Sequence, residues 1–533
     1  MSLARDITTV GGATLASRLL GFARDMAIAA MLGAGAFSDA FFAVLQATNF
    51  FRRLLAEGAL NAAFVPMWLR IKRTEGEAGA YRFFHHVFAA MFLAVAALTA
   101  AGVLFAPTVV DMLAPGFAGE RGELAADYLR IAAPYVALAG MVAIVAAVLN
   151  AERRITAAAA GVVAFNAVLL LALAATAAFS LPAGWDVGAL LAHAIVLAGI
   201  AQLAVTGVGF LRLPAAPRDR RFGFSADAGR FFVLAAPGLV AAGIPQLKLI
   251  AGAMIASSSQ AAVSWLYYAN RLYELPLGVV SVAIASVLVP RIAIGVRNAE
   301  RSEIAAAQSR ALEIALGLAL PSAAAFAVLA QPIAGGLFER GAFGPRDSAA
   351  VAAALAAICA GLPGHALEKV FGAVSFAHED TRTPMVAALA GLAAAVAASL
   401  ALFPRYGHVG VAAAIALSGW VGAALLGAIL RRRGWLHLDR DAMRRLPRIA
   451  LGTMVMAITI FGAREVLAPW TLASGTLARL AALALLVAIG LGIYLASLET
   501  LGVVRMRELL ASMQASARQG SAPHDRQKRS PDY

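Results

Sequence analysis

Charged side chains interrupt two apolar segments near the start of the chain, between residues 17 and 66. Burying one charge at the centre of a bilayer costs roughly 2.5–3.5 kcal/mol. A cluster of charges is therefore tolerable only where the side chains face a water-filled cavity lined by protein. Arginine suits such a cavity to anions, because its guanidinium donates paired hydrogen bonds to phosphate oxygens. The charged residues of this candidate site are Arg18, Arg24, Asp25, Asp39, Arg52, Arg53 and Glu57.

Helical periodicity predicts which of these side chains share a face. At about 100° per residue, the second segment has a polar face with a polar edge beside it. The face comprises Asp39, Gln46, Arg53, Glu57 and Asn61, and the edge comprises Asn49 and Arg52. In the first segment Arg18 and Asp25 share a face, whereas Arg24 points elsewhere unless the helix bends near Gly21. Periodicity alone favours Arg53 over Arg52 as the cavity residue.

Ordinary structural roles compete with binding at several of these positions. Arg24 and Arg53 would also suit the membrane interface, where long basic side chains extend their charged ends toward water. Asp39 and Ser38 are both residues that begin helices well. Glu57 would serve equally as the partner of Arg53 one turn earlier. The sequence leaves these alternatives open.

Further charges lie in an apolar segment of the second half of the chain. Arg271 and Glu274 are three residues apart with Asn270 beside them, so they either face the first group across a cleft or satisfy each other. Counted over both groups and Lys248, six cations exceed four carboxylates by two. A phosphate-bearing lipid would neutralise that surplus, and a pyrophosphate diester carries a comparable negative charge.

Other ionisable residues are accessory candidates. Lys248 is isolated in an apolar run, and Pro245 would break the helix there. His365, Glu368 and Lys369 cluster in a later segment, where we expect the end of a helix rather than the wall of a cavity. Lys248 and Lys369 are kept as accessory positions of the site.

Composition places these segments in a membrane. Of 533 residues, 61% are hydrophobic and 14% charged, and the mean hydropathy is +0.79, which is typical of a polytopic helical chain. Stretches long enough to span a bilayer contain about 20 residues. We expect fourteen, near 7–32, 38–69, 84–110, 125–149, 157–180, 187–211, 231–256, 262–289, 309–330, 348–374, 384–403, 408–430, 447–468 and 475–497.

Basic residues concentrate in alternate loops and predict an orientation. Arginine is frequent near residues 70–82, 153–154, 212–221, 291–301 and 431–448 and in the tail, but scarce in the opposite loops. By the positive-inside rule, the basic loops and both termini are cytoplasmic. The net charge of +14 therefore reflects membrane topology, and we expect a lipid bilayer and no nucleic acid as partner. The first residues lack the pattern of a cleaved signal and predict a retained helix.

An internal repeat predicts two related bundles. The hexapeptides AFVPMW at 63–68 and VLVPRI at 287–292 each end a long helix with Pro and precede a basic loop. We expect helices 1–6 in residues 1–223, helices 7–12 in 224–435, two further helices in 436–503 and a basic, partly disordered tail in 504–533. The predicted fold is an all-α polytopic membrane protein of about 14 transmembrane helices in two pseudo-symmetric six-helix bundles plus two C-terminal helices, with its cavity between the bundles.

Several motifs, in order along the chain, resemble one known family. They are SRLLGFARD, SDAFF, NFFRRLLAEGA and AFVP near the start, and later SWLYYANRLYELPLGV and FAHEDTRTP. Together they resemble the MurJ/MviN lipid II flippases, a branch of the multidrug/oligosaccharidyl-lipid/polysaccharide exporter superfamily. The match runs from about residue 5 to residue 430.

The resemblance implies a substrate and residue roles. It implies that the chain moves lipid II, the undecaprenyl-pyrophosphate-linked disaccharide pentapeptide, from the cytoplasmic to the periplasmic leaflet of the bacterial inner membrane, with cell-wall synthesis enzymes as candidate partners. The motif favours Arg52 where periodicity favours Arg53. Carried over by motif, the head-group contacts are Arg18, Arg24, Arg52 and Arg271, and their partners are Asp25, Asp39, Glu57 and Glu274.

The sequence departs from the family pattern at three places. Thr48 stands where Pro is usual, and Asn270 where Asp is common. Gly252 occupies a position where some members carry an acidic residue for a cation, and residues 385–403 contain no Asn or Asp to complete such a site. Sodium coupling is therefore not expected, and we predict neither a metal site nor a cofactor.

Three other functions stay open. A drug or cation antiporter of the same superfamily would need an acid-dominated cavity, and a flippase of another polyprenyl-linked glycan would differ only in fine motif detail. A membrane enzyme acting on polyprenyl phosphates would need clustered carboxylates for Mg²⁺. Glu379 and Asp380 are adjacent and so lie on different helix faces. The single cysteine, Cys359, lies in an apolar run, so a catalytic thiol is not expected.

Overall fold

The computed structural model describes residues 3–56, 59–176, 178–213, 226–284, 301–471 and 475–504. The elements in these ranges are all helices, which confirms the predicted fold class. Glu57, the hexapeptide at 287–292 and the tail after Val504 lie outside the described residues. The helices are α1 (Leu3–Leu32), α2 (Ala36–Ala56), α3 (Ala59–Leu104), α4 (Ala106–Leu113), α5 (Glu120–Ala132), α6 (Pro134–Ala151), α7 (Ile155–Ala175), α8 (Val187–Leu211), α9 (Ala226–Ala256), α10 (Ala262–Ala283), α12 (Arg301–Phe338), α13 (Pro345–Cys359), α14 (Leu362–Ala377), α15 (Arg382–Arg432), α16 (Arg440–Val466), α17 (Ala468–Thr471) and α18 (Thr476–Thr500).

Each of the fourteen predicted spans coincides with one or two of these helices over its described residues. α3 and α15 are longer than a single span, because each continues through a glycine with positive φ at which the helix changes direction. These glycines are Gly76, with φ of 72°, and Gly407, with φ of 54°. Glycine adopts such angles without the steric cost that a Cβ imposes. α15 therefore supplies two of the predicted spans, 384–403 and 408–430.

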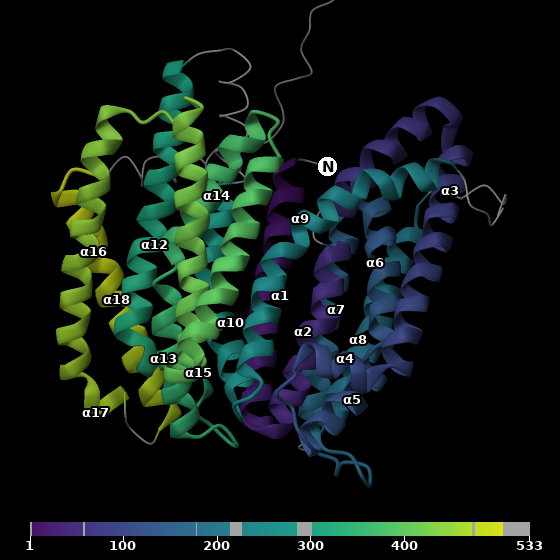
Figure 1. Cartoon of the computed structure of the whole chain (residues 1–533), viewed down its shortest axis with the longest axis horizontal. Helices are drawn as coiled ribbons and strands as arrows, with labels where there is room; N and C mark the ends of the chain where they lie inside the picture. Colours follow the sequence, from purple (N-terminus) through teal and green to yellow (C-terminus); the bar gives the residue numbers. More distant parts are fainter. Residues whose placement is uncertain are drawn as a thin grey trace, which may run out of the picture.

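Eight helical stretches of the described chain are long and apolar enough to cross a bilayer, and the bent pair α13–α14 makes a ninth. α1, α9 and α10 are not among them, although they lie in the interior of the molecule (Figure 1). These are helices that carry charges of the candidate site, and such charges are tolerated where neighbouring helices cover them. The chain is a multi-pass helical membrane protein.

Two groups of helices stand side by side. Figure 1 shows α3–α8 gathered on one side and α12–α18 on the other, with α1, α2, α9 and α10 towards the middle. The start of α1 and the connection from α15 to α16 lie at one end of the molecule, and α17 lies at the opposite end. The helices that carry the candidate site therefore lie where the two groups meet.

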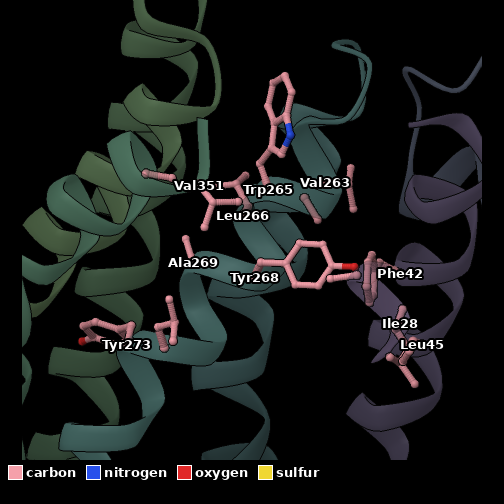
Figure 2. Packing of buried hydrophobic residues seen from close by; sticks show 14 of the residues in the cluster. Ile28, Phe42, Leu45, Val263, Trp265, Leu266, Tyr268, Ala269, Tyr273 and Val351 are labelled. Carbon is pink, nitrogen blue, oxygen red and sulfur yellow. The ribbon is translucent and has the colours of Figure 1, made fainter. Parts of the chain in front are cut away.

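An aromatic layer packs α2 against α10. Phe42 stacks on Tyr267 with ring centroids 4.0 Å apart, and it meets the edge of Tyr268 at 5.1 Å. Figure 2 shows the Tyr268 side chain directed at Phe42. Phe338 and Phe343 pack on the other side of Tyr268, with centroids at 5.0 and 5.3 Å. Such ring pairs contribute about 0.5–1.5 kcal/mol beyond the area they bury, so this layer stabilises the contact between the two groups.

Asp380 joins the two ends of α15 at the loop of the FAHEDTRTP motif. Its carboxylate accepts hydrogen bonds from the backbone N–H of Arg382 (3.0 Å) and Thr383 (3.1 Å) and from the Thr383 hydroxyl, and it pairs with Arg433. Burial alone would raise the pKa of Asp380, but these donors outweigh burial and lower the pKa to about 2. The carboxylate thus caps the start of α15 and holds its end nearby.

Replacing Asp380 with Ala should destabilise the protein by about 1–2 kcal/mol, because it removes a helix cap and an ion pair. Thermal unfolding in detergent micelles would measure the loss. A carboxyl whose folded pKa is lowered stabilises above its unfolded pKa, near 3.9, and this contribution disappears as the pH falls towards about 2. The difference between Asp380→Ala and the unsubstituted chain should close over that interval.

The exposed neighbour Glu379 provides the control. Glu379→Gln should leave the unfolding temperature nearly unchanged. A stability difference for Asp380→Ala that stays constant down to about pH 2 would contradict the assignment, since the protonated carboxyl no longer accepts these bonds as an anion.

Candidate functional site

A cavity of about 410 Å³ lies where α1, α2 and α10 meet, and α7, α8 and α9 complete much of its wall. Among the described residues, five arginines and one carboxylate line it, so its surface is strongly positive. Arginines from three helices therefore share one space. The polar lining consists of Ser17, Arg18, Arg24, Gln46, Asn49, Arg52, Arg53, Asn166, Gln202, Gln246, Asn270, Arg271 and Glu274.

Asp25 positions two of these arginines. Its carboxylate is fully buried, and Arg24 of the same helix donates to Oδ1 from Nη2 at 2.6 Å and from Nε at 3.0 Å. Arg271 of α10 forms an ion pair through its Nε with Oδ2. The Tyr267 hydroxyl also donates to Oδ1, at 3.4 Å. One carboxylate thus bridges α1 and α10 and compensates part of the charge of the two guanidinium groups.

Two glycines allow arginines to approach neighbouring helices. A Cβ on Gly21 would lie 2.8 Å from Nη2 of Arg271, and a Cβ on Gly278 would lie 2.7 Å from Nη1 of Arg18. α1 continues unbroken from Leu3 to Leu32, so the bend at Gly21 that periodicity required is not needed. Arg24 still lines the cavity, because its side chain is long enough to extend into the cavity.

Arg53 connects α2 to both α10 and α9. Its Nη1 and Nη2 each lie 3.2 Å from Oε1 of Glu274, and Nη1 donates to Gln246 at 3.3 Å. Asn270 donates to the same Glu274 oxygen at 3.3 Å. Glu274 also lies 3.7 Å from Nη1 of Arg271 one turn earlier. The two interpretations of Glu274 from sequence are therefore both realised, since it faces the first group and also pairs locally.

Arg18 and Arg52 differ from the other three arginines. Among the described residues, neither has a carboxylate within 4 Å of its guanidinium. Arg52 donates from Nε to Asn49 at 3.1 Å, which orients it with a neutral group. Both Arg52, which the motif favoured, and Arg53, which periodicity favoured, line the cavity. Their partners differ, so their roles should differ.

Asp39 does not line this cavity, and its role in substrate binding stays a prediction. Its fully buried carboxylate accepts hydrogen bonds from the N–H of Ala261 (2.7 Å) and Ser264 (2.9 Å) and from the Ser264 hydroxyl (2.6 Å). Arg121 lies 3.5 Å away. These donors belong to the first turn of α10, where an anion is favoured. Asp39 therefore caps α10 from α2, about 21 Å along α2 from Arg53.

The accessory lysines do not line the cavity either. Lys248 is buried and faces Glu368 of α14, with Nζ 3.9 Å from Oε2. Lys369 is exposed. A 2.8 Å hydrogen bond joins the Tyr273 hydroxyl to Nδ1 of His365. His365, Glu368 and Lys369 all lie in the first half of α14, so the cluster does not mark the C-terminal end of that helix.

Sequence reasoning missed several amides of the cavity wall. Asn166 of α7 accepts a 3.1 Å hydrogen bond from Nη1 of Arg24 and donates to the Ser17 carbonyl at 3.3 Å. Gln202 of α8 and Gln246 of α9 also line the cavity. The sequence could have indicated Asn166, because an isolated amide in an otherwise apolar helix needs a polar neighbour.

Comparison with known proteins decides the family. A family model described as "Lipid II flippase MurJ" matches residues 28–481. The chain belongs to the MurJ family. A probable lipid II flippase MurJ of Rhizobium meliloti (strain 1021) is 38% identical over 524 residues, which is 97% of both chains. The lipid II flippase MurJ of Burkholderia cenocepacia is 31% identical over 465 residues, covering 86% of this chain and 89% of the relative.

Solved structures share the fold. A lipid II flippase MurJ in an inward closed conformation aligns with a TM-score of 0.78 at 21% identity and covers 94% of this chain and 99% of its own. An inward-facing multidrug resistance MATE family transporter of the MOP superfamily aligns with a TM-score of 0.62 at 15% identity, covering 78% and 94%. The family expected from the motifs is thus confirmed, and the MurJ architecture is shared with MATE transporters.

Replacing Asp39 with Asn should loosen the contact between the starts of α2 and α10. The amide accepts more weakly, and its NH₂ group faces donors, so a charge-assisted contact of about 1.5–3 kcal/mol is lost. Spin labels at the exposed positions Phe37 and Ser258 would report the separation. We expect a larger fraction of long distances in Asp39→Asn.

The matched control is Asp111→Asn, which changes an exposed carboxylate in α4. It should leave the distance distribution unchanged. An identical distribution in Asp39→Asn and the unsubstituted chain would show that this carboxylate does not hold the two helices together.

Proposed function

We propose that this MurJ-family protein is a flippase that moves lipid II across the bacterial inner membrane. The observation that carries the proposal is the convergence of five arginines on one intramembrane cavity in a chain of this family. A pyrophosphate is the part of lipid II that needs such a surface, because each guanidinium donates two parallel hydrogen bonds to phosphate oxygens. The protein acts as a transporter and not as an enzyme.

The five arginines would bind the pyrophosphate in two different ways. Arg18 and Arg52 have no carboxylate partner in the described chain, so they offer full positive charge to an incoming anion. Arg24, Arg53 and Arg271 are held by Asp25 and Glu274, and they would exchange part of that pairing for the pyrophosphate. The carboxylates hold the empty site together, and their replacement by substrate favours a different arrangement of the helices.

Alternating access fits the positions of the two α2–α10 contacts. One lies at Asp39 and Ser264, and the other at Arg53 and Glu274 on the far side of the aromatic layer. The cavity lies beside the second contact. Exchanging the Arg53–Glu274 pair for substrate would free one end, while opening at Asp39 would release substrate on the opposite side.

The size of the cavity also bears on the cycle. A volume of about 410 Å³ corresponds to a drug-sized ligand, since such pockets measure about 300–1,000 Å³. A disaccharide pentapeptide is larger than this. The pyrophosphate would therefore lie among the arginines while the rest of the head group occupies space created when the two groups of helices separate.

The same proposal includes the orientation of the chain in the membrane and its division into bundles. Residues 1–223 and 224–435 would form the two six-helix bundles, with both termini and the basic loops in the cytoplasm. Lipid II would enter from the cytoplasmic leaflet and leave to the periplasmic leaflet, where cell-wall synthesis enzymes consume it. A cation antiporter is the alternative for this fold, but a cavity with five arginines and one carboxylate repels cations.

Replacing Arg52 with Gln should lower transport of lipid II by about tenfold to a hundredfold, because one charge-assisted contact of about 1.5–3 kcal/mol is lost. The measurement uses proteoliposomes containing labelled lipid II and an externally added degrading enzyme that attacks only the exposed leaflet. The lipid II affinity of the detergent-solubilised protein should fall by a similar factor.

Arg346→Gln is the matched control, since this arginine is exposed at the start of α13 and lies outside the cavity. It should transport as well as the unsubstituted protein. Absence of leaflet exchange in the unsubstituted protein would overturn the proposed function, and equal transport by Arg52→Gln would overturn the role of the arginine.

A further inference from the structure

A second buried charge pair lies behind the wall of the cavity. Lys248 of α9 is 7% exposed, and its Nζ lies 3.9 Å from Oε2 of Glu368 in α14. Both charged side chains pack against glycines of α15, where the missing Cβ atoms leave room for them. A Cβ on Gly391 would lie 3.0 Å from Lys248 Nζ, and a Cβ on Gly422 would lie 2.9 Å from Glu368 Oε1.

The pair is weakly compensated for its depth. At 3.9 Å it is an ion pair without the short contact of a hydrogen bond, and Glu368 is the one carboxylate within 4 Å of Lys248 in the described chain. Burying two charges costs more than their attraction returns unless hydrogen bonds satisfy both groups. A buried charge without adequate partners tends to gain or lose a proton.

The surroundings on each neighbouring helix are mostly neutral. α10 contributes Tyr273, which lies near Glu368, and α13 contributes Cys359, which lies near Tyr273. α15 contributes glycines at the pair. On α14 itself, His365 lies one turn before Glu368, and Lys369 follows it. Besides the pair, Lys369 is the charged group that acts on Glu368, and His365 is a titratable group near Lys248.

A hydrogen bond between Tyr273 and His365 joins α10, which lines the cavity, to α14, which carries Glu368. Glu274 lines the cavity, and the next residue back along α10, Tyr273, is hydrogen-bonded to His365 at 2.8 Å. His365 and Glu368 are three residues apart in α14 and so share a face. Groups of this kind, arranged in sequence across an apolar interior, typify proton pathways in membrane transporters.

α9 couples the pair to the cavity mechanically. Gln246, Leu249 and Ile250 line the cavity, whereas Lys248 points to α14 on the other side of the same helix. Gln246 is also bonded to Arg53. A displacement of α9 when the cavity binds or releases substrate would therefore change the distance between Lys248 and Glu368.

We propose that Lys248 and Glu368 form a proton-binding site that couples transport to a proton gradient. When α9 moves away from α14, the Glu368 carboxylate takes up one proton from water on one side of the membrane, forming an O–H bond at Oε2. When the pair re-forms in the other arrangement of the helices, the O–H bond breaks, the proton passes to water on the opposite side, and the carboxylate again faces the ammonium group. The coupling rests on the flippase function proposed above, whereas the proton site itself does not.

Infrared difference spectra of the full chain in lipid bilayers, recorded between acidic and alkaline buffer, test the site directly. Exposed carboxylates protonate on acidification in every variant, so the diagnostic signal is the additional carboxyl band of the buried Glu368, which should be absent in Glu368→Gln. Glu379→Gln, which changes an exposed carboxylate in the loop after α14, should keep the band. Persistence of the band in Glu368→Gln would overturn the assignment.

Transport tests the coupling. A gradient of about one pH unit across proteoliposomes should change the rate of lipid II movement by up to about tenfold in the unsubstituted protein, since one proton per cycle contributes that factor. The double variant Lys248→Met/Glu368→Gln leaves no unpaired buried charge, so it should fold, and its rate should not respond to the gradient. Glu379→Gln should respond fully.

The possible failures are distinguishable. If the unsubstituted protein moves lipid II but the double variant responds to the gradient equally, proton coupling at this pair is wrong while the flippase function stands. If the unsubstituted protein moves no lipid II, the proposed function is wrong, and the infrared result still decides whether Glu368 binds a proton.

Discussion

The structure depends on balancing guanidinium groups with carboxylates inside a membrane. Asp25 provides much of this charge compensation, because its two oxygens contact Arg24 on its own helix and Arg271 on α10. Removing one partner of such a buried pair typically costs about 3–5 kcal/mol. Asp25 thus compensates guanidinium groups of both α1 and α10, whereas Arg18 and Arg52 line the cavity without a carboxylate partner in the described chain.

α2 and α10 organise everything around that cavity. They run in the same direction, since Asp39 contacts Ser264 near both starts and Arg53 contacts Glu274 further along both helices. Polar contacts at the two ends can be exchanged separately, whereas the aromatic layer between them resists separation by packing. A helix pair held at two separate contacts could open at either end, which is what the proposed alternating access requires.

Much of the fold followed from hydropathy, because apolar stretches of about 20 residues have few alternatives in a bilayer. Arg18, Arg24, Arg52, Arg53 and Arg271 were identified for the same reason. Distances between helices were not predictable, since periodicity assigns a face but not the neighbour that meets it.

Two residues show this limit. Asp39 has the spacing of a cavity residue, yet the start of α10 approaches it with three donors. Asn166 drew no attention because its partner Arg24 is distant in sequence.

The stacked rings of Phe42 and Tyr267, with Tyr268 buried beside them, have a consequence for the cell. A charged, hydrated hollow deep inside a bilayer invites a continuous file of water, through which ions would leak and dissipate the stored voltage. This dry partition interrupts such a file between the cavity and the capped start of α10. The protein can therefore contain a charged cavity in a membrane that maintains a potential without conducting ions across that membrane.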